Sequence, residues 1–155
     1  MAAGITSITI AVEGPIDEAV ARRLIDAAGA TLGAVYGKSG KPAVLQRLSG
    51  YNAAARFSPW LVMVDLDQDA DCAPPFRARH LPQLAETMCF RIAVRETEAW
   101  LMADRDALAD FLSVTPARIP LQPDEIPQPK QTLVNLASHT RRRDIREGMV
   151  PRPGS

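Results

Sequence analysis

Acidic side chains stand at the ends of two apolar runs, where together they could bind a divalent cation. Asp65 and Asp67 follow the run 60–64, and the period of two in an extended chain puts both carboxylates on one side. Glu13 ends the run 5–12. Neighbouring carboxylates repel one another unless a cation compensates them, and their hard oxygen atoms suit Mg²⁺ or Mn²⁺ better than zinc. The spacing therefore predicts a metal site for phosphoryl-transfer chemistry.

Small and basic residues near these acids could receive a phosphate. Gly14 removes a side chain directly after Glu13, and the helix expected to follow offers its N-terminus to an anion. Lys38, Lys41 and Arg95 are expected near the same edge, where their charges would contact a phosphate or nucleic acid. The alternative is a purely structural role, with a tight strand-to-helix turn at Gly14 and solvated charges at the three basic positions.

Two further acids follow a later apolar run, 90–94. Glu98 is the better candidate for an additional metal ligand, and Glu96 lies two residues before it. The alternative for both is a favourable interaction with the dipole of the helix that they begin. Asp17, Asp69 and Glu96 are supporting candidates for the same site.

The elements that must position these residues alternate along the chain. Apolar and β-branched runs predict four strands, at residues 5–12, 31–36, 60–64 and 90–94. Helical spacing, with Pro or Gly at the ends, predicts three helices between them, at residues 15–28, 42–49 and 81–88. This alternation is typical of an α/β fold with a mainly parallel four-stranded sheet and helices on both faces. Ligands of such sheets bind beyond the carboxyl ends of the strands, where Glu13 and Asp65 emerge.

The C-terminal part of the sequence is predicted to extend the same domain. Residues 96–112 have a helical pattern that Asp104 could divide by capping a second segment. Five prolines within residues 113–129 predict an extended connection, after which a last helix runs into a group of arginines. We therefore expect an α/β domain over residues 1–112, with the connection and C-terminal helix of residues 113–155 packed on it. The final Pro-Gly-Ser, without a closing element, suggests that a C-terminal portion of the protein is absent.

The composition excludes several classes of protein. The 155 residues include 18 basic and 18 acidic side chains, so any attraction to nucleic acid must be local. Apolar runs are shorter than the roughly 20 residues that a membrane helix needs, and no secretory signal is recognisable, so we expect a cytoplasmic protein without membrane contact. Two cysteines and two histidines form no zinc-binding pattern. The arginines near the end would contact a phosphate backbone or form a solvated helix end: Arg141, Arg142, Arg143, Arg146 and Arg152.

Four short motifs carry a resemblance to a known family. The sequence resembles the Toprim domain of topoisomerases, bacterial primases and related nucleases, through Glu13-Gly14 and through Asp65-Leu66-Asp67, over roughly residues 5–100. It is more closely similar to the bacterial Toprim-like family DUF4276, and that resemblance spans nearly the whole chain. The motifs are Val12-Glu-Gly-Pro, Val64-Asp-Leu-Asp, Arg95-Glu-Thr-Glu-Ala-Trp-Leu and Pro129-Lys-Gln-Thr-Leu.

The Toprim resemblance implies particular roles for the acids. Glu13 would act as general acid/base or as a metal ligand, while Asp65 and Asp67 would coordinate Mg²⁺ during the making or breaking of a phosphodiester. Ala70 stands where many Toprim enzymes have glycine, so the loop after the aspartates differs. The chain has no room for the separate domain that supplies a topoisomerase tyrosine.

Three functions are compatible with these residues. The first is a metal-dependent nuclease or phosphotransferase that acts on nucleic acid. The second is a non-catalytic or partner-dependent regulatory module of a nucleic-acid-processing or defence complex. The Toprim resemblance implies an ATPase as a partner in such a complex. The third is a small-molecule phosphatase that uses the same acids.

Overall fold

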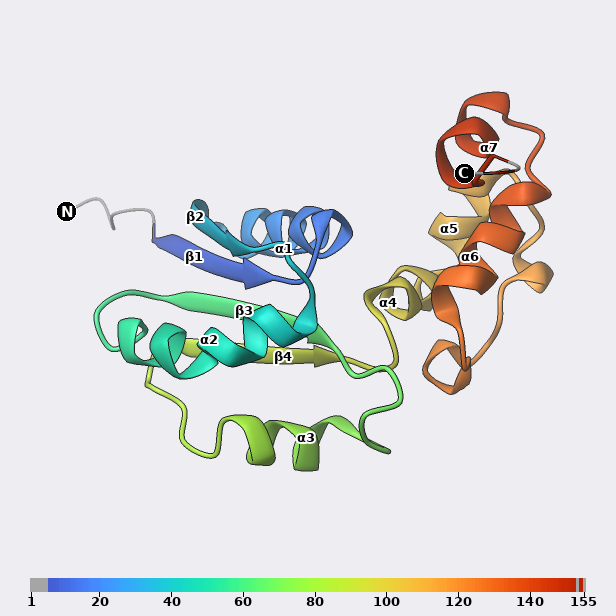
Figure 1. Ribbon diagram of the computed structural model, residues 1–155. Helices are drawn as coiled ribbons and strands as arrows, with labels where there is room; N and C mark the ends of the chain where they lie inside the picture. Colours follow the sequence, from blue (N-terminus) through green and yellow to red (C-terminus); the bar gives the residue numbers. More distant parts are fainter. Residues whose placement is uncertain (1–5, 153, 155) are drawn as a thin grey trace. The chain divides into compact units, whose positions relative to one another are not determined.

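A four-stranded parallel sheet forms the centre of the N-terminal part of the chain. The computed structural model describes residues 6–152 and 154, and in this part the strand order is β2-β1-β3-β4 (Figure 1). Every pair of neighbouring strands is parallel. The strands are β1 (Ser7–Val12), β2 (Thr31–Gly37), β3 (Trp60–Asp65) and β4 (Met88–Ala93). The predicted α/β fold class is therefore confirmed.

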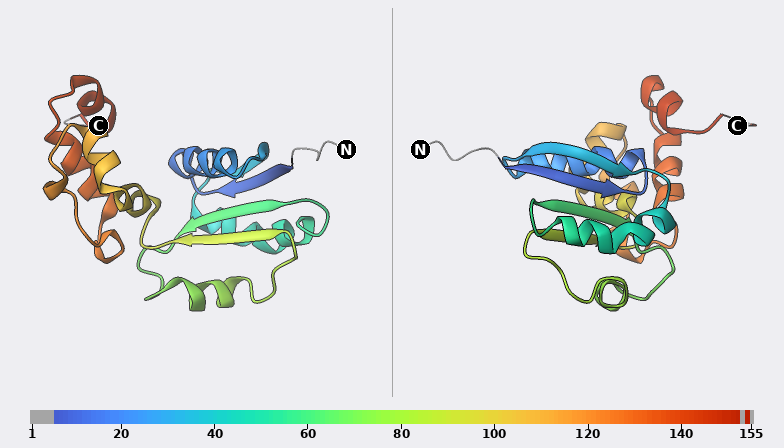
Figure 2. Two further views of the ribbon diagram at one scale, coloured as in Figure 1. Left: turned by 180° about the vertical axis from the view of Figure 1, so that it is seen from behind. Right: turned by 60° about the vertical axis from the view of Figure 1, so that its left-hand side comes forward.

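Helices cover the sheet between successive strands. They are α1 (Pro15–Ala27), α2 (Lys41–Ala54) and α3 (Ala73–His80). In the order β2-β1-β3-β4, the connection from β1 to β2 runs toward one side of the sheet, and the connection from β2 to β3 runs toward the other side. Because both crossovers are right-handed, α1 and α2 lie on opposite faces of the sheet. Figures 1 and 2 show this arrangement. The carboxyl ends of all four strands consequently point to the same edge of the sheet.

The core of this part lies around β3, whose residues from Trp60 to Val64 are all buried. Continuous apolar runs of this kind are typical of strands covered on both faces. Helix α2 continues past Gly50, where the sequence predicted its end, because Tyr51 packs on Trp60 with ring centroids 5.1 Å apart. One glycine in a helix costs only about 1 kcal/mol, and this buried contact outweighs that cost.

The third helix lies earlier in the sequence than predicted. Residues 81–88 were expected to be helical, whereas α3 occupies Ala73–His80 and ends before Pro82. Pro74 lies in the first turn of α3, a position that tolerates a missing N–H. Pro82 disfavours a helical conformation for the residue before it, which explains the end of the helix at this point.

The remainder of the chain, from Val94 onward, forms a second compact unit. The expected boundary at residue 112 therefore lies inside this unit. Its helices are α4 (Thr97–Ala103), α5 (Arg105–Leu112), α6 (Pro129–Ser138) and α7 (Arg143–Met149). Two short 3-10 turns, Pro116–Arg118 and Pro123–Glu125, lie in the Pro-rich connection.

The second unit has a hydrophobic core of its own, which explains why the division precedes α4. Its buried residues are Met102, Ala109, Leu112, Ile119, Leu133, Leu136, Ala137 and Ile145. The predicted break between α4 and α5 is confirmed, because the Asp104 side chain accepts a hydrogen bond from the Ala107 N–H at 3.1 Å. The prediction of a single last helix was wrong, because α6 ends at Ser138 and a separate helix, α7, begins at Arg143.

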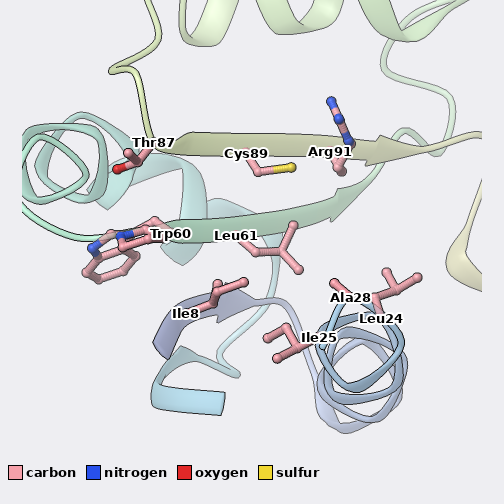
Figure 3. Close-up of a pocket in the computed structure, with 10 residues that line it drawn as sticks. Ile8, Leu24, Ile25, Ala28, Trp60, Leu61, Thr87, Cys89 and Arg91 are labelled. Carbon is pink, nitrogen blue, oxygen red and sulfur yellow. The ribbon is translucent and has the colours of Figure 1, made fainter. Parts of the chain in front are cut away.

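An apolar hollow of about 240 Å³ lies on the α1 side of the sheet (Figure 3). Leu24 and Ile25 of α1 form one wall, and Leu61 and Cys89 form its floor. Trp60 lies at the amino end of β3, so this end of the hollow is far along the strand from Asp65. The hollow is therefore separate from the acidic edge.

No helix in the part of the chain that the structure describes is long and apolar enough to span a membrane.

Candidate functional site

Glu13 joins the ends of two neighbouring strands. Strands β1 and β3 are paired in parallel, with Ala11 opposite Val62, so their carboxyl ends lie side by side. Glu13 follows β1 directly, and its Oε1 accepts a hydrogen bond from the Asp65 N–H at 2.7 Å. The structure thus brings Glu13 and Asp65 together. The contact uses the main-chain N–H of Asp65, whereas the sequence predicted only that the two carboxylates would lie close together.

The Glu13 carboxyl lies in surroundings that favour its protonated form. Burial raises its pKa above the ordinary value of 4.5, and the negative charges of Asp17 and Asp67 act in the same direction. The hydrogen bond from Asp65 and the positive charge of Lys41 oppose this shift without cancelling it. A carboxyl with a raised pKa is better suited to accept and return a proton near neutral pH.

Asp67 does not continue the extended conformation of β3. The strand ends at Asp65, and Asp67 has a φ of +50°, in the left-handed region. The period-of-two argument for a shared side therefore fails at Asp67, because the chain has already turned. Its Oδ2 accepts a hydrogen bond from Lys41 Nζ at 2.5 Å, and Asp69 Oδ2 accepts from the same nitrogen at 2.8 Å.

The loop that precedes Lys41 is hydrogen-bonded to the end of β1. The Lys38 N–H donates to Val12 O at 2.8 Å, and the Gly40 N–H donates to Glu13 O at 3.0 Å. Gly37 has a φ of +87°, and a Cβ at this position would lie 2.2 Å from Val12 O. Only glycine permits this approach. The loop is therefore a fixed support for Lys41.

Lys41 itself is largely buried, with only 11% of its side chain exposed. Burial acts to lower the pKa of its ammonium, but the hydrogen bonds to Asp67 and Asp69 outweigh this effect and leave the pKa raised. Lys41 is thus firmly held as a cation at the acidic edge. We name Glu13, Asp65, Asp67, Asp69 and Lys41 together the edge cluster.

The sequence predicted that a phosphate could approach the main chain at Gly14, but the Gly14 N–H already has an acceptor. Asp17 Oδ2 lies 3.0 Å from the Gly14 nitrogen, in a capping-box arrangement at the start of α1. The spacing of three residues between Gly14 and Asp17 is the sequence signal that could have predicted this bond. A phosphate at this helix end would have to replace or share the Asp17 contact.

The neighbouring Lys38 belongs to a different set of contacts. Its ammonium lies 3.2 Å from Glu18 Oε2 on α1, and Glu18 also binds Arg22. Nearly half of the Lys38 side chain is exposed. Lys38 and Lys41, three residues apart, therefore face different acids.

The remaining predicted residues lie in the second unit. Glu96 Oε2 accepts a hydrogen bond from the Lys130 N–H at 2.8 Å, so Glu96 binds the first turn of α6. This is the helix-terminus role that the sequence left open, although at another helix than expected. Glu98 is buried in the first turn of α4, and Arg95 is half-buried just before that helix. Their contribution to a metal or phosphate site stays a prediction.

Part of the arginine group near the end is paired with acids on its own helix or turn. Arg142 Nη2 lies 2.7 Å from Asp144 Oδ2, and Arg143 Nε lies 2.6 Å from Glu147 Oε1. Both pairs are exposed, as expected for a solvated helix end. These contacts reduce the positive charge that this segment would present to a phosphate backbone.

The oxygen donors of the edge cluster fit Mg²⁺ or Mn²⁺ by their chemistry. Among the described residues, no three His, Cys, Asp or Glu side chains are grouped closely enough to hold a metal ion by themselves. Mg²⁺ usually keeps several waters and is bound by one or two carboxylates together with substrate phosphates. Asp65 and Asp67 suit that mode, because both are partly exposed at the edge of the sheet.

The fold and the edge cluster define an α/β protein whose parallel sheet carries acids at the carboxyl ends of β1 and β3. Comparison with protein-family models, curated proteins and solved structures gives no match.

Proposed function

We propose that the protein is a Mg²⁺-dependent phosphoryl-transfer enzyme that acts on nucleic acid, as a Toprim-type nuclease. The observation that supports this proposal most is the position of the Glu13 carboxyl, bonded to the main chain of Asp65 at the ends of β1 and β3. In open parallel sheets this edge is where ligands bind. The Toprim resemblance of Glu13-Gly14 and Asp65-Leu66-Asp67 agrees with this location.

Each residue of the cluster has a role in this proposal. Asp65 and Asp67 would hold the metal ion, which when bound would orient a phosphate and stabilise the charge that develops on it. Glu13 would take up or release a proton at its free carboxylate oxygen, because burial raises its pKa. Its other oxygen accepts from the Asp65 N–H and keeps the carboxyl aimed at the edge.

The proposal is tested by cleavage assays with single- and double-stranded DNA and RNA in the presence of Mg²⁺ or Mn²⁺. Asp65→Asn retains the size of the side chain and removes its charge, so we expect activity to fall by at least about a hundredfold. Asp26→Asn is the matched control, because it makes the same change at an exposed position near the end of α1. Activity that survives Asp65→Asn would overturn the proposal.

A further inference from the structure

The edge cluster already contains a cation, the ammonium of Lys41. Lys41 Nζ contacts Asp67 Oδ2 and Asp69 Oδ2, at 2.5 and 2.8 Å. The lysine side chain is 11% exposed, whereas the two aspartates are 46% and 48% exposed. Solvent ions can therefore reach the carboxylates while the ammonium lies behind them.

The charges of this group do not balance. Lys41 carries one positive charge and contacts two carboxylates, those of Asp67 and Asp69. A phosphate that approached this contact would meet two negative charges and one positive charge. A divalent cation bound to the carboxylates would reverse that sign and would compete with Lys41 for Asp67.

We propose, on the basis of the function above, that Lys41 exchanges its partners when the metal ion binds. In the metal-free protein its ammonium occupies Asp67 and Asp69. When the metal ion takes the Asp67 carboxylate, the ammonium is released and contacts the phosphate of the nucleic acid. Lys41 then links metal binding to phosphate binding.

The fixed support of Lys41 makes this exchange possible without movement of the main chain. The loop before Lys41 is held by hydrogen bonds to Val12 O and Glu13 O, neither of which involves the lysine side chain. The four-carbon stem of a lysine is flexible, so the ammonium can turn to another partner once the metal ion has taken Asp67. Lys41 also begins α2, whose N-terminal N–H groups favour a negative charge nearby.

The first experiment measures Mn²⁺ binding by isothermal titration calorimetry, without nucleic acid. Lys41→Met removes the competing ammonium, so we expect Mn²⁺ to bind about tenfold more tightly than to the wild type. Lys38→Met is the matched control, because it removes the same charge from the same loop at a lysine that faces Glu18. Lys41→Arg retains the charge and should bind Mn²⁺ nearly as the wild type does.

The second experiment measures the affinity for a fluorescently labelled oligonucleotide, with and without Mn²⁺, by fluorescence anisotropy in the Glu13→Gln background, which removes the proposed proton transfer. We expect Lys41→Met to weaken binding about tenfold with Mn²⁺ present and to leave it nearly unchanged without the metal. A lysine with only a structural role would alter neither the metal affinity nor this difference. Circular dichroism of each variant shows that it is folded.

The outcomes separate this inference from the proposed function. Equal Mn²⁺ affinity of the wild type and Lys41→Met would overturn the exchange while leaving the enzyme proposal intact. An equal gain in Mn²⁺ affinity for Lys38→Met would also overturn it, because the effect would then be general to the surface charge. No Mn²⁺ binding by any variant would overturn both proposals.

Discussion

Glu13 is a residue whose ionisation depends on the fold. Its carboxyl is half-buried between the ends of β1 and β3, and burial raises its pKa above the ordinary value of 4.5. In the unfolded chain the pKa returns to that ordinary value. The folded protein therefore binds a proton at Glu13 more tightly, and its stability falls as the pH rises through the interval between the two pKa values.

Glu13→Gln is expected to stabilise the protein at neutral pH. Glutamine cannot ionise, and its side-chain oxygen can still accept from the Asp65 N–H, so the gain should be below about 1 kcal/mol after solvent screening. Urea unfolding at a series of pH values measures it, and the gain should disappear as the pH falls below the ordinary pKa. Glu18→Gln is the matched control, with the opposite sign, because hydrogen bonds from Arg22 and Lys38 lower the pKa of Glu18.

The residues of the site were predictable from the sequence to different degrees. Glu13 and Asp65 could be placed at one edge because strand ends follow directly from apolar runs. The left-handed φ of Asp67 could not be predicted, since aspartate adopts this conformation only where the local turn requires it. The contact of Lys41 with Asp67 joins residues 26 apart in the sequence and depends on the whole sheet being assembled.

At the scale of single elements, the start of α1 provides a test of phosphate approach. Gly14 has an extended φ of −158°, and a Cβ there would have Asp17 Oδ2 as its nearest neighbour, at 3.8 Å. Neither the backbone conformation nor the available space therefore requires glycine for folding. If glycine is needed at this position, the reason lies in what the protein binds.

Gly14→Ser is expected to separate stability from activity. Serine is a favoured N-cap residue, so the free energy of unfolding should change by less than about 0.5 kcal/mol. If a phosphate approaches Gly14, the added side chain should reduce nucleic-acid cleavage by about tenfold or more. Gly50→Ala, a helical position with no atoms within 4 Å of the new Cβ, serves as the control with full activity. Full activity of Gly14→Ser would contradict the predicted phosphate contact.

The elements themselves were predicted best where the sequence has strong boundaries. Pro15 and Gly29 enclose α1 closely, because proline suits a first helical position and glycine suits the positive φ just past the end. The segment 81–88 was misleading, because its apolar spacing resembles a helix although the structure forms turns there and begins β4 at Met88. Helix α3 has few apolar residues, with only Phe76 buried, so periodicity alone could not locate it.

At the scale of the whole molecule, the part of the chain that the structure describes divides into two compact units, and the second has a hydrophobic core of its own. The sheet unit ends at Ala93, and the helical unit that follows is built around residues such as Leu112 and Leu136. The sequence predicted one domain with residues 113–155 packed on it, because composition and length do not reveal how buried residues are partitioned. The helical pattern of residues 96–112 was recognised, but its burial partners lie further along the chain, in α6 and α7.

Leu112→Ala is expected to destabilise the helical unit selectively. Leu112 is completely buried, and removal of such a side chain costs about 3 kcal/mol because a cavity remains. Native-state hydrogen exchange should show lower protection in α5 and α6, while the amides of β1 and β3 keep theirs. Leu121→Ala, at a position that is 76% exposed, is the control with little effect. An equal loss of protection in both units would show that they unfold together.

The main-chain hydrogen bonds that hold the loop before Lys41 have a consequence for protein engineering. Because the bonds at Val12 O and Glu13 O do not depend on side chains, residue 41 can be exchanged without loss of its anchoring. An aspartate or histidine at this position would start from a fixed Cα facing the two aspartates of the neighbouring loop. The sheet edge is therefore a place where a new ligand set can be designed by altering one side chain while the main-chain bonds of the loop are retained.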